Sequence, residues 1–293
     1  MKPIALAALL LSFSPSLATA GWGSHDLEVS TRGGAPLICS DLEVTVGHRP
    51  AAVAEQAMTL AAGQTVRVRA ARNSGISVEA ADRRDVAILA CKAAADGSDL
   101  DRIRVTLEDG LLTASGPAGD SWVAYFLIEV PRAATVDVEA GNGPIWLEHL
   151  MGKVSARSQN GPISVKNCAG SVDAQAENGP IGVSGSGGDI RIRTQNGPIS
   201  VRLSGSGWDG PGLDARAVNG PVSLRIPDGY RSGALVASAG HSPFRCKGGA
   251  CGHANRTWDD DGNRVELGSG PLAVRLSTVN GPVSVAGIDG EED

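Results

Sequence analysis

The tripeptide Asn-Gly-Pro occurs six times in this chain, and its spacing constrains the fold more than any other feature. The first four copies begin 18 residues apart, and two further copies follow at longer intervals. The copies begin at Asn142, Asn160, Asn178, Asn196, Asn219 and Asn280. A fixed period of this kind is typical of a fold built from stacked structural repeats.

Apolar and polar residues alternate on both sides of each copy. The residue six positions before each Asn, and the residue three positions after it, is Val, Ile or Leu in every copy. In the second copy these residues are Val154 and Ile163, and Ala156 and Val165 continue the apolar positions along each segment. Alternation with period two indicates strands with one buried face and one solvent-facing face.

The Pro that follows each Asn-Gly argues against a hairpin. Asn-Gly between alternating strands normally favours a two-residue hairpin, but the residue after Gly must then donate its N–H across the turn, and Pro has none. We therefore predict an all-β fold, a parallel β-solenoid from about Thr135 to Val285 with 18-residue coils of two strands each. Gly would supply a positive φ at the corner, and the Asn side chains would stack into a ladder. Val154–Ser158 should then not pair antiparallel with Ile163–Asn167.

The two longer intervals fit insertions into this pattern. The interval from Asn196 to Asn219 is 23 residues, one coil plus five, and the extra length is assigned to a bulged corner at 205–212. The interval from Asn219 to Asn280 is 61 residues, three coils plus seven. Residues 241–263 break the pattern there and predict a projecting loop, which in repeat folds is often a binding element.

The N-terminal residues predict export and a cap. Residues 1–20 read as a signal peptide, with Lys2, an apolar run from Ile4 to Leu11, and small residues up to Ala20 at the cleavage site. We expect a protein released into the periplasm or the exterior, with no transmembrane helix. Residues 21–130 lack the repeat but keep strand patterns, so we expect a β region that caps the solenoid of residues 131–293, because an uncovered coil would expose unpaired backbone groups.

Charge and aromatic content restrict the partners. The net charge is −6 and the basic residues are scattered, which argues against nucleic acid. Aromatic residues make up only 3% of the chain, and Trp146, an exception in a repeat strand, is a candidate binding residue together with three basic residues. Lys166, Arg202 and Arg225 share one outward column on a flat, small-residue face. That face could dock an anionic polysaccharide or an envelope protein, although a merely solvated face is the favoured interpretation of these residues alone.

Five cysteines follow the predicted signal peptide. Disulfides are the default state of cysteines in an exported protein. Cys246 and Cys251 flank a short Gly-rich loop, which a disulfide between them could close easily. A disulfide between Cys39 and Cys91 would cross-link the N-terminal region. Cys168 would lie unpaired at a coil corner.

Two metal readings compete with simpler ones in residues 241–263. The cluster of His241, Cys246, Cys251 and His253 has the ligand types of a zinc site, but its spacing matches no common zinc pattern, and oxidation would remove both thiolates. The run Asp259–Asn263 offers oxygen ligands for calcium and is equally ordinary turn chemistry. We expect no metal and no cofactor, and the calcium alternative stays open.

Several motifs resemble those of a known family. They are the segment Val130–Val138, the repeated Asn-Gly-Pro-Ile-Ser-Val units, the run Leu267–Gly270 and the last coil, Leu276–Val285. The chain from about Val130 onward resembles the bacterial putative adhesin family, exported β-strand-repeat proteins that form a domain of unknown function. The resemblance implies a β-solenoid and implies no catalytic residues.

Two functional readings follow. The favoured one is an exported, non-catalytic cell-envelope scaffold or adhesin-like binding module of unknown ligand. The alternative is a polysaccharide-active β-helix enzyme, a lyase or hydrolase, with Asp173 and Asp214 or the cluster Asp259–Asp261 as acids. Asp173 and Asp214 should lie two coils apart, roughly 9–10 Å, within the range of an inverting pair. Arg191 between them would keep both ionised and leave no proton donor, so we expect no enzyme.

Overall fold

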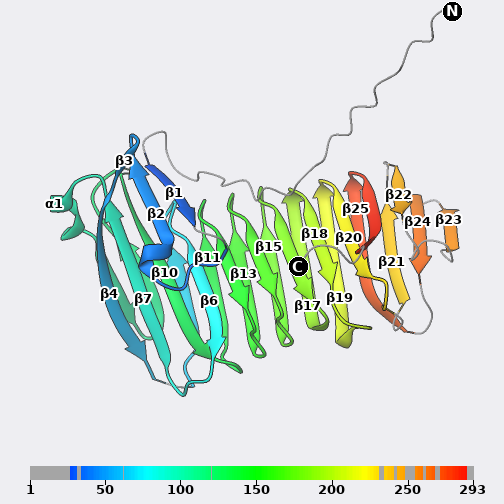
Figure 1. Cartoon of the computed structure of the whole chain (residues 1–293), viewed down its shortest axis with the longest axis horizontal. Helices are drawn as coiled ribbons and strands as arrows, with labels where there is room; N and C mark the ends of the chain where they lie inside the picture. The colour runs from blue at the N-terminus through cyan, green and yellow to red at the C-terminus, as the bar shows by residue number, and fades with distance from the viewer. Residues whose placement is uncertain are drawn as a thin grey trace, which may run out of the picture.

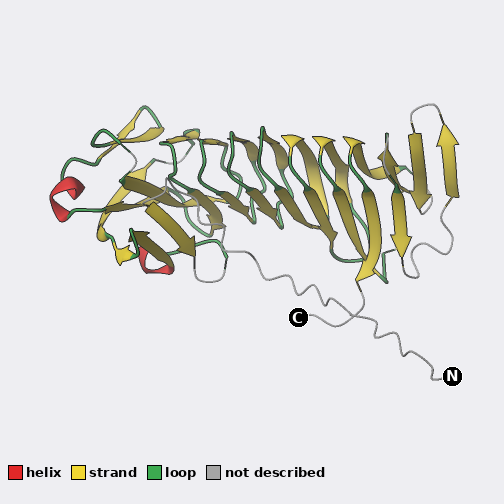
Figure 2. Ribbon diagram, turned by 90° about the horizontal axis from the view of Figure 1, so that it is seen from above, coloured by secondary structure: helices red, strands yellow, loops and turns green. Residues whose placement is uncertain are grey.

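The computed structural model describes residues 27–31, 34–61, 63–119, 121–230, 234–240, 243–247, 255–259, 262–267 and 271–288. These residues form an elongated, all-β molecule (Figure 1). Figure 2 shows two layers of strands joined by short loops along the length of the rod. No helix in the described ranges is long and apolar enough to cross a membrane. The predicted signal peptide, residues 1–20, lies outside these ranges.

The strands form three sheets. Sheet I has eleven strands, in the spatial order β22 (Phe244–Lys247), β26 (Val283–Ile288), β20 (Val222–Pro227), β18 (Ile199–Leu203), β16 (Ile181–Gly185), β14 (Ile163–Lys166), β12 (Ile145–Glu148), β6 (Ile76–Ala81), β10 (Trp122–Pro131), β7 (Val86–Ala94) and β4 (Ala52–Leu60). Sheet II has twelve, in the order β23 (Asn255–Asp259), β24 (Gly262–Leu267), β21 (Ala234–Ala239), β25 (Leu272–Asn280), β19 (Asp209–Asn219), β17 (Gly187–Asn196), β15 (Ser171–Ala176), β13 (Lys153–Ser158), β11 (Val136–Ala140), β5 (Val66–Ala70), β9 (Leu111–Ser115) and β8 (Arg104–Glu108). Sheet III contains β1 (Leu27–Thr31), β2 (Leu42–Val46) and β3 (Arg49–Pro50). The described helices are the short α1 (Gly97–Leu100) and a 3-10 turn, η1 (Cys39–Asp41).

Successive strands of the repeat alternate between the two long sheets. The strand before each Asn-Gly-Pro lies in sheet II and the strand after it lies in sheet I; we call such a pair of strands one level. Val154 in β13 pairs in parallel with Val136 and with Val172, one repeat away on either side. Ile163 pairs in the same way with Ile145 and Ile181. The predicted parallel pairing between repeats is confirmed, and the hairpin that Pro argues against does not form.

The inward positions of the levels form one continuous core. Val154 and Ile163 are only 2% and 1% exposed, and the equivalent Val, Ile, Leu and Ala residues of the other levels are buried in the same cluster. Polar side chains occupy the alternate, outward positions. Burial of these branched side chains removes apolar surface from water along the whole rod, which is its main stabilising term.

The asparagines of the repeat form a ladder along one corner. Each side-chain amide donates to the side-chain oxygen of the Asn one level closer to the N-terminal end, at 2.7–3.0 Å. The ladder runs from Asn280 to Asn142 and ends on Asn73, to which Asn142 donates at 2.9 Å. Ladders of stacked amides of this type are a known stabilising feature of in-register parallel strands.

Replacing Asn178 with Asp should lower the free energy of unfolding by about 1 kcal/mol. Asn178 donates to Asn160 at 3.0 Å and accepts from Asn196 at 2.9 Å, and an aspartate can accept but cannot donate. Urea unfolding measures the difference. Gln195→Glu is the matched control, because it makes the same amide-to-acid change at an exposed side chain that has no place in the ladder. Equal effects of the two substitutions would contradict a stabilising ladder.

The corner glycines serve a different purpose from the predicted one. None of the six Gly residues of Asn-Gly-Pro has a positive φ, so that expectation is wrong. Instead, each corner backbone lies directly on the corner of the neighbouring level. A Cβ built on Gly161 would meet the carbonyl oxygen of Gly143 at 2.0 Å. Glycine is needed because the stacked backbones leave no room for a side chain.

One level precedes the first Asn-Gly-Pro. β5 pairs in parallel with β11, and β6 pairs in parallel with β12, in the same register as the later levels. Its corner carries Asn73-Ser-Gly75 in place of Asn-Gly-Pro. The expected N-terminal β region therefore contributes a repeat-like level, after which β10, β7 and β4 extend sheet I, and β9 and β8 extend sheet II.

The last Asn-Gly-Pro level is inserted between two earlier segments. β25 and β26 pair directly with β19 and β20, and Asn280 donates to Asn219 at 2.8 Å. β21 and β22 lie beyond them, although they come earlier in the chain. Adjacent levels can thus be 61 residues apart in sequence, although this interval of three coils plus seven residues predicted that other coils separate Asn219 from Asn280. The described parts of 241–263 add strands β22 and β23 to the sheets instead of forming only a projecting loop.

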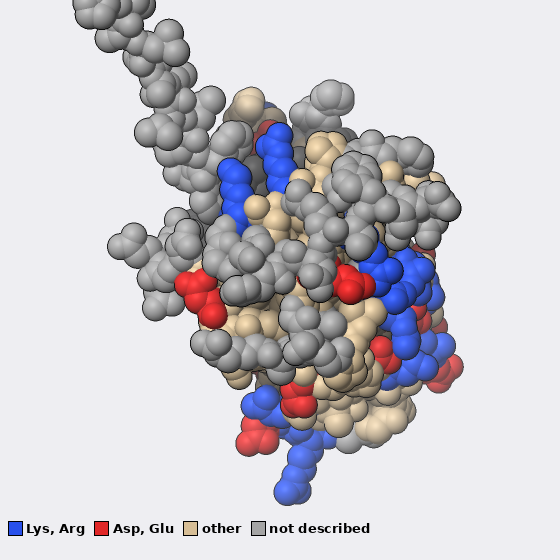
Figure 3. Space-filling view, turned by 90° about the vertical axis from the view of Figure 1, so that its right-hand side faces the viewer, with Lys and Arg blue, Asp and Glu red and all other residues tan. Residues whose placement is uncertain are grey.

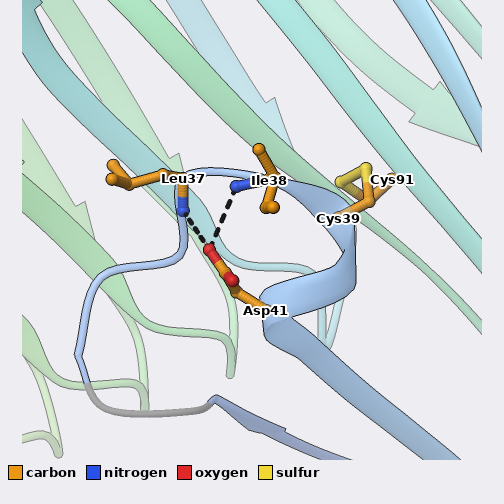
Figure 4. Close-up of a disulfide and its surroundings, with 5 residues drawn as sticks. All are labelled: Leu37, Ile38, Cys39, Asp41 and Cys91. Carbon is orange, nitrogen blue, oxygen red and sulfur yellow. Dashed lines mark hydrogen bonds between the residues drawn. A yellow bond between two sulfur atoms is a disulfide. The ribbon is translucent and has the colours of Figure 1, made fainter.

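Sheet III packs against the outer face of sheet I near the N-terminal end. A second apolar cluster, which includes Leu27, Val29 and Tyr125, fills the contact. A disulfide joins Cys39 in η1 to Cys91 in β7 (Figure 4). The Asp41 carboxylate accepts the backbone N–H groups of Leu37 and Ile38 at 3.0 and 3.2 Å and orders the loop that carries Cys39.

Candidate functional site

The predicted basic residues lie in one column on the outer face of sheet I. Lys166, Arg202 and Arg225 occupy the same register position in β14, β18 and β20, and Arg202 and Arg225 are directly paired across neighbouring strands. The Lys166 ammonium lies 3.0 Å from the carboxylate of Glu148, which offsets its charge. Neither arginine forms an ion pair with another residue of the described ranges. The structure therefore brings together two neighbouring guanidinium groups.

Trp146 has a different environment from the arginines. It is half-buried and packs against the apolar cluster beneath sheet III. It stands in β12, three strands from Arg202 in β18. Its packing role explains an aromatic residue at an outward repeat position, and it does not join the arginine pair.

A polar groove follows the outer face of sheet II. It has a volume of about 940 Å³ and crosses six neighbouring strands, from β5 to β19. Its lining includes exposed arginine and glutamine side chains that recur on alternate levels, among them Arg157, Gln159, Arg193 and Gln195. The sequence analysis did not predict this groove, although the repeated Gln before Asn160 and Asn196 was a visible signal.

Ion pairs neutralise most of the charge in the groove. Arg193 lies 3.3 Å from Asp173, and Arg216 lies 2.6 Å from Asp214. Arg157 approaches Asp137 at 3.7 Å. Seen end-on, basic and acidic side chains intermingle along one side of the molecule (Figure 3). The groove thus offers hydrogen-bonding groups with little net charge, which suits a polar ligand better than a strongly anionic one.

The two candidate acids are held by arginines other than the predicted one. Asp173 and Asp214 are two levels apart in one column with Arg191 between them, as expected. Arg191, however, pairs with Asp189 at 3.1 Å, while Asp173 and Asp214 bond to the arginines of the groove. An inverting pair needs one protonated carboxyl group. Both carboxylates of this pair accept guanidinium hydrogen bonds, from Arg193 and Arg216.

One group of metal-ligand side chains appears in the described part of the chain. Glu79, Glu148 and His149 place ligand atoms within 4.8 Å of one another. Glu79 and Glu148 are directly paired across β6 and β12, and Lys166 and His149 flank them. The Lys166 ammonium supplies charge compensation for the two adjacent carboxylates.

The cysteines separate into bonded and buried groups. The Cys39–Cys91 disulfide agrees with the prediction. Cys246 is disulfide-bonded, and its predicted partner, Cys251, lies outside the described residues, as do His241 and His253 of the zinc reading. Burial raises the pKa of the Cys168 thiol to about 11, so this thiol stays protonated and unreactive at neutral pH. The side chains of the calcium reading, Asp259–Asn263, also lie outside the described set.

The chain is similar to several solved structures and to no family model. No protein-family model and no curated protein matches it. A putative adhesin from Parabacteroides distasonis is 10% identical with a TM-score of 0.44, over 80% of this chain and 97% of its own. A putative adhesin from Parabacteroides merdae is 10% identical with a TM-score of 0.40, over 81% and 96%. A putative cell adhesion protein from Clostridium sporogenes is 10% identical with a TM-score of 0.35, over 80% and 100%.

Proposed function

We propose that the protein is an exported, non-catalytic cell-envelope binding module of the adhesin type. In this proposal the stacked levels form a β-solenoid that serves as a rigid scaffold, and an extended polar polymer, a polysaccharide, lies along sheet II. The Cys39–Cys91 disulfide supports export, because such bonds persist in oxidising compartments.

The groove on sheet II is the observation that carries the proposal. Neighbouring parallel strands lie roughly 4.8 Å apart, so side chains of the same column follow one another at regular steps along the groove. Arg157 and Arg193 stand in one such column, two levels apart with Gln175 between them, and Gln159 and Gln195 stand beside the two arginines. Amide and guanidinium groups together donate and accept many hydrogen bonds. A repeating polymer can engage several steps at once, and weak contacts then multiply.

The arginine pair on sheet I is the second proposed contact. Arg202 and Arg225 lie beside Ser200 and Ser223 on a face of small side chains. Two neighbouring guanidinium groups favour an anionic substituent such as a carboxylate or sulfate. This contact retains the basic face predicted from the sequence, with Lys166 contributing less because Glu148 offsets its charge.

Binding to a glycan array tests the two contacts separately. Gln159→Ala combined with Gln195→Ala should weaken binding about tenfold, because two side-chain hydrogen-bonding groups are lost. Arg202→Glu combined with Arg225→Glu should weaken binding only to anionic glycans. Ser164→Ala, on the same sheet face as the arginines, is the control and should have no effect. Unchanged binding in both double variants would contradict the proposal.

A reducing-sugar release assay on the same glycans tests the enzymatic alternative. The proposal expects no release above the background of the buffer. Release that disappears in the variant Asp214→Asn, with binding retained, would establish a glycan-cleaving enzyme and overturn the binding-module proposal.

A further inference from the structure

The N-terminal end of sheet I finishes in a long strand with one open edge. β4 contains nine residues and is the last strand of the sheet. It pairs antiparallel with β7 along its full length on one side. On the other side its backbone forms no hydrogen bond with a described residue. An open edge presents a row of N–H and C=O groups that can pair with another strand.

β4 lacks the features that usually protect such an edge. Natural edge strands are kept short, or carry Lys, Pro or a bulge. At the opposite end of sheet I, β22 has four residues, two of which are Arg245 and Lys247. β4 contains no Lys, Arg, Pro or Gly, and its one charged residue is Glu55, next to the central residue Gln56. Its outward side chains are exposed, and Val53 is 66% exposed.

The inward side chains of β4 are self-complementary. They run from small to large along the strand, with Ala52 and Ala54 at one end, Gln56 in the middle, and Met58 and Leu60 at the other end. Met58 and Leu60 pack against the core of the rod. When two copies of β4 pair antiparallel about Gln56, each large side chain falls opposite a small one on the same face.

The outward side chains select the same register. Symmetric antiparallel pairing must centre on a residue, because any other centre would place inward and outward side chains opposite each other. Pairing centred on Glu55 would set two carboxylates directly opposite, which is unfavourable. Pairing centred on Gln56 sets Glu55 opposite Ala57 of the second copy. α1 touches the strand beside Ala52, through Gly97, so the pairs from Ala54 to Met58 form the centre of the interface.

We propose that two copies of this chain associate end to end through antiparallel pairing of their β4 strands, centred on Gln56. Sheet I then runs continuously through both copies, and the open edge is closed. A consequence, which rests on the proposed function, is that one dimer carries two binding grooves and gains avidity for a repeating ligand. The dimer itself is independent of any ligand and is tested without one.

Sedimentation of the exported chain over a range of concentrations tests the pairing. The wild-type protein should dimerise reversibly. Ala57→Lys places an ammonium opposite Glu55 of the second copy and should tighten the dimer about tenfold, since two symmetric pairs form. Ala57→Glu places a carboxylate there and should weaken it by a similar factor. Ala133→Lys and Ala133→Glu, at an exposed Ala in the turn between β10 and β11, are the matched controls and should change nothing.

Two results would overturn the proposal. One is a protein that remains monomeric in both the wild type and the Ala57→Lys variant. The other is a dimer whose dissociation constant does not move in opposite directions in the two Ala57 variants, which would place the interface elsewhere. Hydrogen exchange supplies an independent readout, because the edge amides of β4 should become more protected as the protein concentration rises.

Discussion

Replacing Gly179 with Ala should destabilise the protein by about 3 kcal/mol, one of the largest effects of a single methyl group in this chain. A Cβ at this position would lie 2.2 Å from the carbonyl oxygen of Gly161, which belongs to the backbone of the neighbouring level. The clash cannot be relieved by turning a side chain. The two corners must move apart, and that movement breaks the Asn178–Asn160 bond and loosens the core beneath.

Gly182→Ala provides the matched control for this prediction. Gly182 lies in the same level as Gly179, three residues further on, and a Cβ there meets nothing within 4 Å. Gly in the interior of a strand is less stable than Ala by about 0.5–1 kcal/mol, so this substitution should raise stability slightly. Thermal and urea unfolding of the two variants measure the difference. Similar stabilities would show that the levels are not packed as tightly as the structure indicates.

Removing the Cys39–Cys91 disulfide by a double substitution to Ala should lower stability by about 4 kcal/mol. The two cysteines are 52 residues apart in sequence, so the bond closes a long loop and restricts the unfolded chain. In the folded protein it holds η1 and sheet III on β7 (Figure 4). We expect the loss to appear first as faster proteolysis between sheet III and sheet I, ahead of unfolding of the repeat levels.

Ser40→Ala is the control for the disulfide variant, because Ser40 is the exposed neighbour of Cys39 and takes no part in the bond. Urea unfolding followed by tryptophan fluorescence suits the measurement, since Trp146 packs against the cluster beneath sheet III. A double variant as stable as Ser40→Ala would mean that the apolar contact alone holds sheet III in place.

The regular levels were predictable because their information is repeated and local. The 18-residue period aligns chemically equivalent residues. The pairing of Val154 with Val136 and Val172 therefore follows from the period alone. The Pro after each Asn-Gly excludes a two-residue hairpin because Pro lacks the backbone N–H that the hairpin would need. The Cys39–Cys91 bond was also foreseen, from the oxidising compartment that the signal peptide implies.

The arrangement of side chains on the outer faces was less predictable. Arg191 was assigned to Asp173 and Asp214 because all three share a column, yet it pairs with Asp189 on its own strand. The direction of a long side chain depends on every neighbour within its reach, and strand alternation specifies only the face. The groove on sheet II was missed for the same reason, since its hollow results from the lengths and directions of side chains on six strands.

The strands, their inward faces and the parallel stacking of equivalent residues follow from the amino-acid sequence alone, because each depends on a pattern within one repeat. The order of the levels and the reason for the corner glycines become visible only in the folded chain. The level of Asn280 packs beside the level of Asn219 because their strands match in register and their Asn side chains form a hydrogen bond. Both interactions stabilise contact between equivalent corners, whatever the length of chain between them. The glycines are required by the distance between stacked backbones, and that distance exists only once the levels have come together.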